Sequence, residues 1–81
     1  MIDLYSSPTP NGWKVAMALE ELNLPYTVNY IDLAAGDQHK PEFLAMNPNG
    51  RIPVIVDHDA EDLVIFDSNA VLFYLAEKTG K

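Results

Sequence analysis

The sequence contains no cysteine among its 81 residues, which excludes a disulfide framework and a cysteine-ligated zinc site. It also lacks an apolar run of the ~18 residues that a membrane-spanning helix needs. Cations are scarce, because five Lys and Arg stand against 12 Asp and Glu and give a formal net charge of −7. Proteins that bind nucleic acid need a basic surface that so few cations cannot form. We therefore expect no metal, no nucleic-acid partner and no membrane partner.

The composition is that of a globular domain, with 48% hydrophobic and 21% charged residues. The segment from Met1 to Tyr5 lacks the basic start and apolar core of a signal peptide, so we expect a cytoplasmic protein. A length of 81 residues allows one domain. A domain this small buries only about 60–65% of its unfolded surface. It is therefore either compact and well patterned or one part of a larger protein.

The first third of the chain has the pattern of a strand, a helix and a second strand. Thr9 is a good helix N-cap and Pro10 suits the first helical position, whereas Asn23 and Pro25 end the helical pattern. Two strands joined through a helix in about 30 residues are expected to be parallel. The expected elements are a strand over residues 2–5, a helix that begins after Thr9, and a strand over residues 26–33.

The rest of the chain adds two helices and a hairpin. An open loop is expected over residues 34–40, and Asn47 to Gly50 should end the short helix that precedes them. The polar segment His58 to Asp62 is short enough to join two antiparallel strands. Ser68 is expected to cap the last helix and Gly80 to end it. The remaining elements are a helix over Pro41–Met46 and strands over residues 53–57 and Leu63–Phe66.

The order β-α-β-α-β-β-α predicts an α/β domain with a mixed four-stranded sheet flanked by helices. Ligands of such sheets bind at the strand ends, and Thr9 and Asn11 follow the first strand at the start of a helix. A helix N-terminus favours an anion or a thiolate, because its backbone N–H groups are free and its dipole is positive there. The alternative is that Thr9 is only a cap and Asn11 only a turn residue.

Two further segments are candidate sites. If the Ile52–Pro53 bond is cis, it would turn the Ile52 backbone outward as a ligand-binding edge, whereas a trans bond would make Pro53 an ordinary strand start. Asp67 and Ser68 offer a carboxylate, a hydroxyl and a helix start, which suit the ammonium and carboxylate of an amino acid. The alternative for this pair is a plain helix cap.

Three segments of the chain have a recognisable order and spacing. They are Ser6-Ser7-Pro8-Thr9-Pro10-Asn11-Gly12, Asn47-Pro48-Asn49-Gly50-Arg51-Ile52-Pro53-Val54-Ile55-Val56-Asp57 and Phe66-Asp67-Ser68-Asn69-Ala70-Val71-Leu72-Phe73-Tyr74-Leu75. Together they resemble the N-terminal, thioredoxin-like domain of cytosolic glutathione S-transferases. The resemblance covers residues 1–81 and is closest to the nu class and its relatives near the fungal prion-forming nitrogen regulator, a group associated with glutathione-disulfide chemistry.

The resemblance implies a role for each matching residue. Thr9 and Asn11 match the residues near the glutathione sulfur and are the implied catalytic residues. The family's proline at Pro53 is cis, and the backbone of Ile52 would pair with the cysteinyl part. The other implied contacts are Asp67 and Ser68 to the γ-glutamyl group, and Gln38 and Arg51 to the glycyl end or a second glutathione. Asp67 departs from the family's frequent Glu, and Ser6 and Ser7 leave open which hydroxyl serves the sulfur.

The implied function is to bind glutathione as co-substrate and activate its thiolate, either for conjugation to a small electrophile or for disulfide reduction. Because the chain has no cysteine, the ligand must supply the sulfur. The alternative is a non-catalytic scaffold or regulatory module of the same fold. The family continues into an all-helical second domain, absent from this chain, and is expected to form homodimers. Without that domain, we expect bare apolar surfaces at Trp13, Met17, Val71 and Tyr74, and hence either self-association or a missing neighbour.

Overall fold

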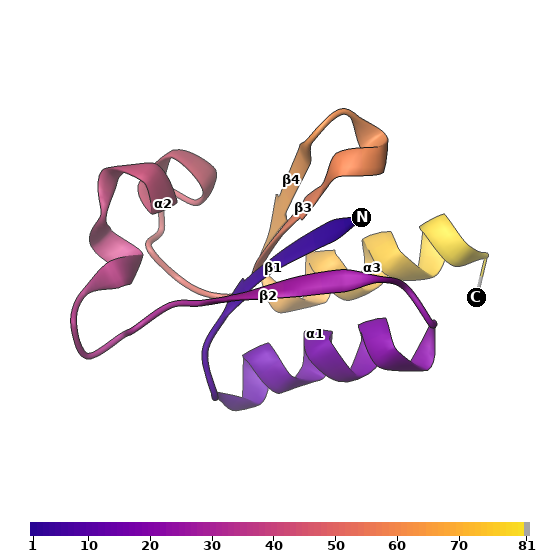
Figure 1. Ribbon diagram of the computed structural model, residues 1–81, viewed down its shortest axis with the longest axis horizontal. Helices are drawn as coiled ribbons and strands as arrows, with labels where there is room; N and C mark the ends of the chain where they lie inside the picture. The colour runs from indigo at the N-terminus through magenta and orange to yellow at the C-terminus, as the bar shows by residue number, and fades with distance from the viewer. Residues whose placement is uncertain (81) are drawn as a thin grey trace.

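The computed structural model describes residues 1–80, so the domain predicted over residues 1–81 is described as far as Gly80. Four strands form one mixed sheet and three α-helices flank it (Figure 1), as predicted. Two single turns of 3₁₀ helix, η1 and η2, add to this set. In chain order the elements are β1 (Ile2–Ser6), α1 (Pro10–Glu21), β2 (Tyr26–Tyr30), η1 (Asp37–His39), α2 (Pro41–Met46), β3 (Val54–Asp57), η2 (His58–Ala60), β4 (Leu63–Phe66) and α3 (Ser68–Thr79).

The sheet has the strand order β2-β1-β3-β4. β1 and β2 are parallel, and Leu4 lies opposite Val28. β3 runs antiparallel to both β1 and β4. The parallel first pair and the antiparallel hairpin are both as the sequence predicts. Consequently β1 and β4 end on the same side of the sheet as the start of β3.

Alternating side chains divide the core between the two faces of the sheet. On one face, Leu4 and Ile55 pack with Leu19 of α1 and Leu75 of α3. On the other face, Val54 packs with residues of and before α2. α1 and α3 therefore lie side by side on one face, as Figure 1 shows, while α2 covers part of the other. The buried residues of this second cluster are Ile31, Phe43 and Val54.

The start of α1 is fixed by local chemistry. The Oγ1 of Thr9 accepts a hydrogen bond from the backbone N–H of Gly12 at 3.3 Å, which confirms Thr9 as the N-cap. A Cβ on Gly12 would lie 2.1 Å from the Oγ of Ser6 and 2.6 Å from the carbonyl oxygen of Ser7. Only glycine therefore lets the first turn of α1 approach the end of β1 this closely.

The segment after β2 differs from the prediction. β2 ends at Tyr30, not at residue 33, because polar side chains redirect the backbone beyond it. Asp37 accepts a hydrogen bond from the backbone N–H of Asp32, and Asp32 accepts one from Ala35. This turn leads into η1, so residues 34–40 are not an open loop. These local bonds replace the ladder that a longer strand would have formed.

The cap of α3 also differs from the prediction. Asp67, not Ser68, is the N-cap, and its Oδ1 accepts a hydrogen bond from the backbone N–H of Asn69 at 2.9 Å. Ser68 is the first residue of the helix. The Asp67 carboxylate, one position earlier, reaches the free N–H of the second helical residue. Asp67 rather than Ser68 is therefore the cap. Gly80, with φ of 74°, ends the helix as predicted.

Several apolar side chains of α1 and α3 lie on the surface. Trp13 and Met17 are 56% and 65% exposed, so they are not core residues. The predicted exposure on α3 was wrong, because Val71 is fully buried against the sheet and Tyr74 is half-buried. Phe73 is instead the exposed apolar residue there, at 69%. Among residues 1–80, no helix has the length and apolar character needed to cross a membrane.

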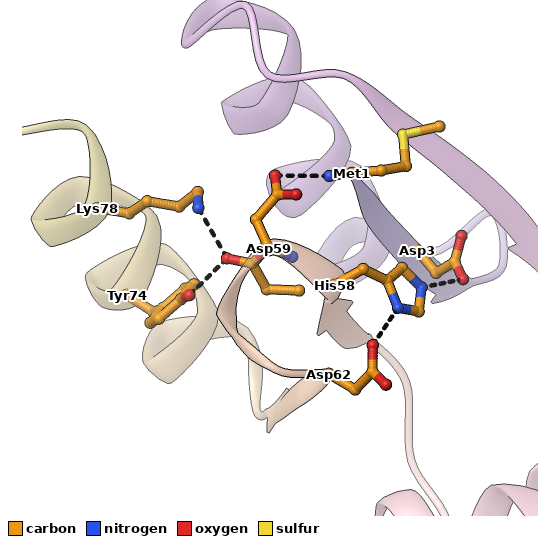
Figure 2. A network of polar contacts seen from close by, with 8 residues as sticks. Met1, Asp3, His58, Asp59, Asp62, Tyr74 and Lys78 are labelled. Atoms are coloured by element: carbon orange, nitrogen blue, oxygen red, sulfur yellow. Dashed lines mark hydrogen bonds and ion pairs between the residues drawn. The ribbon is translucent and has the colours of Figure 1, made fainter.

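A polar network ties the far end of the sheet together (Figure 2). Asp57 at the end of β3 has no exposed surface, and its Oδ2 accepts hydrogen bonds from the hydroxyl of Tyr74 at 2.5 Å and from Nζ of Lys78 at 2.9 Å. Burial acts to raise the pKa of Asp57, but these two donors and the N–H of Asp59 outweigh it and lower the pKa. Burial and the neighbouring Asp57 raise the pKa of Tyr74 to about 12.

His58 joins the network from the β3–β4 turn. Its Nε2 lies 2.8 Å from Oδ2 of Asp3 in β1, and its Nδ1 lies 2.5 Å from Oδ1 of Asp62. Both ring nitrogens can donate only when the ring is protonated. Asp3 first, and then Asp62, raise the pKa of His58 above its usual value. The network therefore fixes β1, the turn and α3 at the end of the sheet away from the candidate site.

Candidate functional site

A polar groove of about 580 Å³ lies where β4 ends and α1 and α3 begin. Its walls come from the first turns of α1, from the loop that precedes β3, and from the junction of β4 with α3. Because both helices contribute their N-terminal turns, free backbone N–H groups and positive helix dipoles surround this space. The lining residues are Asn11, Lys14, Asn47, Asn49, Arg51, Ile52, Phe66, Asp67, Ser68 and Asn69.

Five of the eight site residues predicted from the sequence line this groove. They come from three separate segments that the fold brings together, and they are Asn11, Arg51, Ile52, Asp67 and Ser68. Thr9, Gln38 and Pro53 do not line it. The Ile52–Pro53 peptide bond is cis, as the resemblance implies, and Pro53 is fully buried behind the groove wall.

Thr9 precedes the groove-lining Asn11 by two residues. Its Oγ1 accepts the capping hydrogen bond from Gly12. A hydroxyl that accepts one hydrogen bond retains its own O–H to donate. The capping role of Thr9 and the predicted role as a donor are therefore chemically compatible.

Gln38 lies apart from the groove in η1 and is half-buried. Its Oε1 is buried and has no hydrogen-bond partner. The carbonyl oxygen of Gln38 lies 3.3 Å from the place where a Cβ on Gly50 would be, so η1 touches the loop that carries Arg51. Gln38 therefore lies next to the loop that carries Arg51, and it is not among the groove-lining residues.

Asp67 has an unusual backbone conformation. Its φ of 77° and ψ of 123° are values that residues with a Cβ rarely adopt. Such a conformation costs on the order of 1–3 kcal/mol and is found mostly where function requires it. It places the Asp67 carboxylate at the groove while one of its oxygens caps α3. Asp67 thus combines a negative charge with the positive end of a helix.

Asn47 organises the loop that carries Arg51. It is buried, its Nδ2 donates to the carbonyl oxygen of Arg51 at 2.9 Å, and its Oδ1 accepts from the N–H of Asn49 at 3.0 Å. The N–H of Gly50 also bonds to the Asn47 carbonyl oxygen. Gly50 has φ of 63° and is buried against His39, so the turn requires glycine there. Asn47 is therefore a positioning residue for Arg51 and Ile52.

Sequence reasoning missed half of the groove. The missed residues are Lys14, Asn47, Asn49, Phe66 and Asn69. The Asn-Pro-Asn-Gly run signals a turn, but nothing in the sequence shows that Asn47 points inward. Lys14 lies three positions after Asn11 and hence on the same helix face, a spacing that would have found it.

The groove has a charge pattern unlike that of the whole chain. It contains two cations, Lys14 and Arg51, and one carboxylate, Asp67, in a chain of net charge −7. Within residues 1–80 no group of three or more His, Asp or Glu is arranged to hold a metal ion. The chemistry available is therefore recognition of a ligand with both anionic and cationic groups, together with stabilisation of an anion at the helix starts.

Comparison with known proteins identifies the family. The chain matches the glutathione S-transferase N-terminal domain over residues 9–78. It therefore belongs to this family, as the three sequence segments imply. Its fold is the thioredoxin-like fold of that domain.

The relatives include an oxidoreductase and proteins named URE2. The disulfide-bond oxidoreductase YfcG of Escherichia coli strain K12 is 54% identical over 84 residues, which cover 99% of this chain and 39% of that protein. Protein URE2 of Debaryomyces hansenii is 46% identical, over 85% of this chain and 22% of that protein. The chain thus spans about two fifths or less of the length of these relatives.

Solved structures of similar proteins contain glutathione. The glutathione transferase URE2P8 from Phanerochaete chrysosporium, solved with oxidised glutathione, matches with a TM-score of 0.95 and 43% identity over 99% of this chain and 36% of that one. A glutathione transferase from Burkholderia graminis, with two glutathione molecules bound per subunit, matches with a TM-score of 0.94 and 48% identity, over 99% of this chain and 35% of that one.

Proposed function

We propose that the groove binds glutathione and that the domain activates the glutathione thiol, for attack on a small electrophile or on a disulfide. The observation that carries this proposal is the convergence of Asp67, Ser68 and Arg51 on one polar groove at two helix N-termini. Glutathione has one ammonium group, two carboxylates and a thiol, and the groove offers a complement to each. The glutathione-bound structures of similar proteins support the choice of ligand.

The γ-glutamyl end is assigned to the start of α3. The Asp67 carboxylate pairs with the ligand's ammonium, and Ser68 with the helix N-terminus takes the neighbouring α-carboxylate. The groove-lining backbone of Ile52 pairs with the cysteinyl part, and buried Pro53 supports it from behind. Arg51 holds the glycyl carboxylate.

Gln38 has an indirect part in this proposal. It does not line the groove, and its carbonyl oxygen lies 3.3 Å from where a Cβ on Gly50, the neighbour of Arg51, would be. We assign Gln38 to the support of the loop at the glycyl end. A change at Gln38 would then affect binding through the position of Arg51.

The thiol is assigned to the start of α1. A free thiol with a pKa near 8.5 is mostly protonated at pH 7. Donation from Thr9 and Asn11, together with the helix dipole, stabilises the thiolate and lowers that pKa. Lowering it by one unit requires about 1.4 kcal/mol, which one charge-assisted hydrogen bond can supply. The thiolate then attacks carbon in an electrophile or sulfur in a disulfide, and the leaving group departs with the electron pair of the broken bond.

Isothermal titration calorimetry of the full-length protein with reduced glutathione tests the proposal. We expect binding in the wild type and at least tenfold weaker binding in Asp67→Asn, because the ammonium loses its charged partner. Glu77→Gln, which removes an exposed carboxylate from the far end of α3, is the matched control and should bind normally. No heat with either reduced or oxidised glutathione would favour the scaffold alternative instead.

Three properties of the whole protein are part of the same proposal. An all-helical second domain follows this one, the protein is a homodimer, and it acts in the cytoplasm. The family membership supports these assignments, and the exposed side chains of Trp13, Met17 and Phe73 offer apolar surface for further contacts. Size-exclusion chromatography with light scattering on the full-length protein tests the dimer, and a monomer would contradict it.

A further inference from the structure

Lys14 is a cation in the groove for which residues 1–80 supply no ion-pair partner. Of the other lysines in residues 1–80, Lys40 pairs with Asp37 at 3.0 Å and Lys78 with Asp57 at 2.9 Å. Lys14 makes no ion pair within these residues. It is exposed, and it lies three residues after Asn11 on the groove-lining face of α1. A chain with 12 acidic residues has thus left this ammonium open toward the ligand space.

One glutathione molecule does not need this cation. In the proposed binding mode its ammonium faces Asp67, its α-carboxylate faces Ser68 and the start of α3, and its glycyl carboxylate faces Arg51. Each charged group of the ligand then has a partner from the β4–α3 junction or from the loop before β3. Lys14 comes from the third wall, α1, where the sulfur is expected. Lys14 is therefore the groove-lining cation to which this binding mode assigns no group of the first glutathione.

We propose that Lys14 is a specificity-determining residue that binds a carboxylate on the far side of the ligand sulfur, as in the second half of glutathione disulfide. This inference rests on the proposed function, because it assigns the ligand beyond the first glutathione. The ligand class is a disulfide whose second half carries a carboxylate, in preference to an uncharged electrophile. An ammonium on a flexible stem suits this role, since it can follow a group whose position varies.

The test compares the affinities of oxidised and reduced glutathione in the full-length protein. In Lys14→Gln we expect the affinity for oxidised glutathione to fall about fivefold, the effect of one partly exposed ion pair. The affinity for reduced glutathione should change less than twofold. Lys14→Arg should retain most of the wild-type preference because it keeps the charge. Lys40→Gln removes the same charge outside the groove and should leave both affinities unchanged.

The possible outcomes distinguish a failure of the proposed glutathione site from a failure of the role assigned to Lys14. A wild type that binds neither form of glutathione overturns the proposed function and this inference with it. A wild type that binds reduced glutathione, with Lys14→Gln showing no selective loss for the oxidised form, overturns the inference alone. An equal loss for both forms also overturns it, because Lys14 would then contact the first glutathione. Added salt should weaken the preference of the wild type for oxidised glutathione, because salt screens a charge contact. The same addition should have a smaller effect on Lys14→Gln, and this pair of results supports the inference.

Discussion

The ammonium of Lys78 in α3 lies 2.9 Å from Oδ2 of Asp57, a carboxylate with no exposed surface at the end of β3. Lys78→Gln removes a charged donor from a buried anion, and we expect the free energy of unfolding to fall by about 2 kcal/mol. Urea denaturation at pH 7 measures this. Lys40→Gln, which breaks only the exposed pair with Asp37, should lower the free energy of unfolding much less, because solvent screens that pair. Equal effects of the two changes would contradict the role given to Asp57.

Because two carboxylates lie next to the His58 ring, we expect the stability of the domain to depend on pH in the neutral range. Its pKa is raised in the folded state by Asp3 and Asp62, so its contribution is complete below the unfolded value near 6.5 and is lost as pH rises through the folded value. Denaturation curves across this range should show stability falling with pH in the wild type. The fall should be absent in His58→Gln and retained in His39→Gln. A fall that persists in His58→Gln would assign it to another group.

The strained conformation of Asp67 predicts opposite effects on stability and binding. Asp67→Gly removes the energetic cost of the positive φ, because glycine adopts it freely, but it also removes the side chain that caps α3. We expect a net gain of about 1 kcal/mol in the free energy of unfolding. Glutathione binding should fall at least tenfold with the lost carboxylate. Asp67→Asn keeps the cap and the strain, so it should lose binding without gaining stability. Thermal denaturation and calorimetry on the same samples check both parts, and a glycine variant that binds normally would refute the ammonium contact.

Thr9 and Asn11 predict separable effects on the glutathione thiol. Asn11→Ala should raise the pKa of the bound thiol by about 1, because one donor to the thiolate is lost. Thr9→Ala should raise it too, and should also destabilise the protein by about 1 kcal/mol through loss of the α1 cap. Thr9→Ser keeps the hydroxyl and controls for the methyl group. Ultraviolet titration of the thiolate measures the pKa, and unchanged titrations in both alanine variants would remove these residues from the sulfur site.

Local signals in the sequence were sufficient for most of the fold. Pro10 after Thr9 marked the start of α1, and the short polar link from His58 to Asp62 marked an antiparallel hairpin, because each signal depends only on neighbouring residues. The end of β2 was misplaced because apolar residues continue past Tyr30 while Asp32 and Asp37 form a turn. The choice between Asp67 and Ser68 as cap depended on a positive φ that composition does not reveal.

The site was predictable where residues of distinctive chemistry occur in recognisable segments. Asn11, Arg51 and Asp67 carry such chemistry, and the fold brings them to one groove. Asn47 was missed because its function depends on burial and on two hydrogen bonds made across a turn. Lys14 was missed because a surface lysine is ordinary in a sequence, although its spacing from Asn11 puts both on one helix face. For Gln38 the resemblance implies a contact with the glycyl end or a second glutathione, and this stays a prediction, since Gln38 does not line the groove.

The central claim is that the groove at the starts of α1 and α3 is the glutathione site. The most direct measurement is a titration of ¹⁵N-labelled protein with reduced glutathione, followed by the backbone amide shifts in heteronuclear NMR spectra. We predict saturable shifts at Asn11, Ile52, Ser68 and Asn69, with no change around His58 and Asp59 at the opposite end of the sheet. Shifts confined to other surfaces, or no saturable shift at these four amides, would contradict the assignment of the groove.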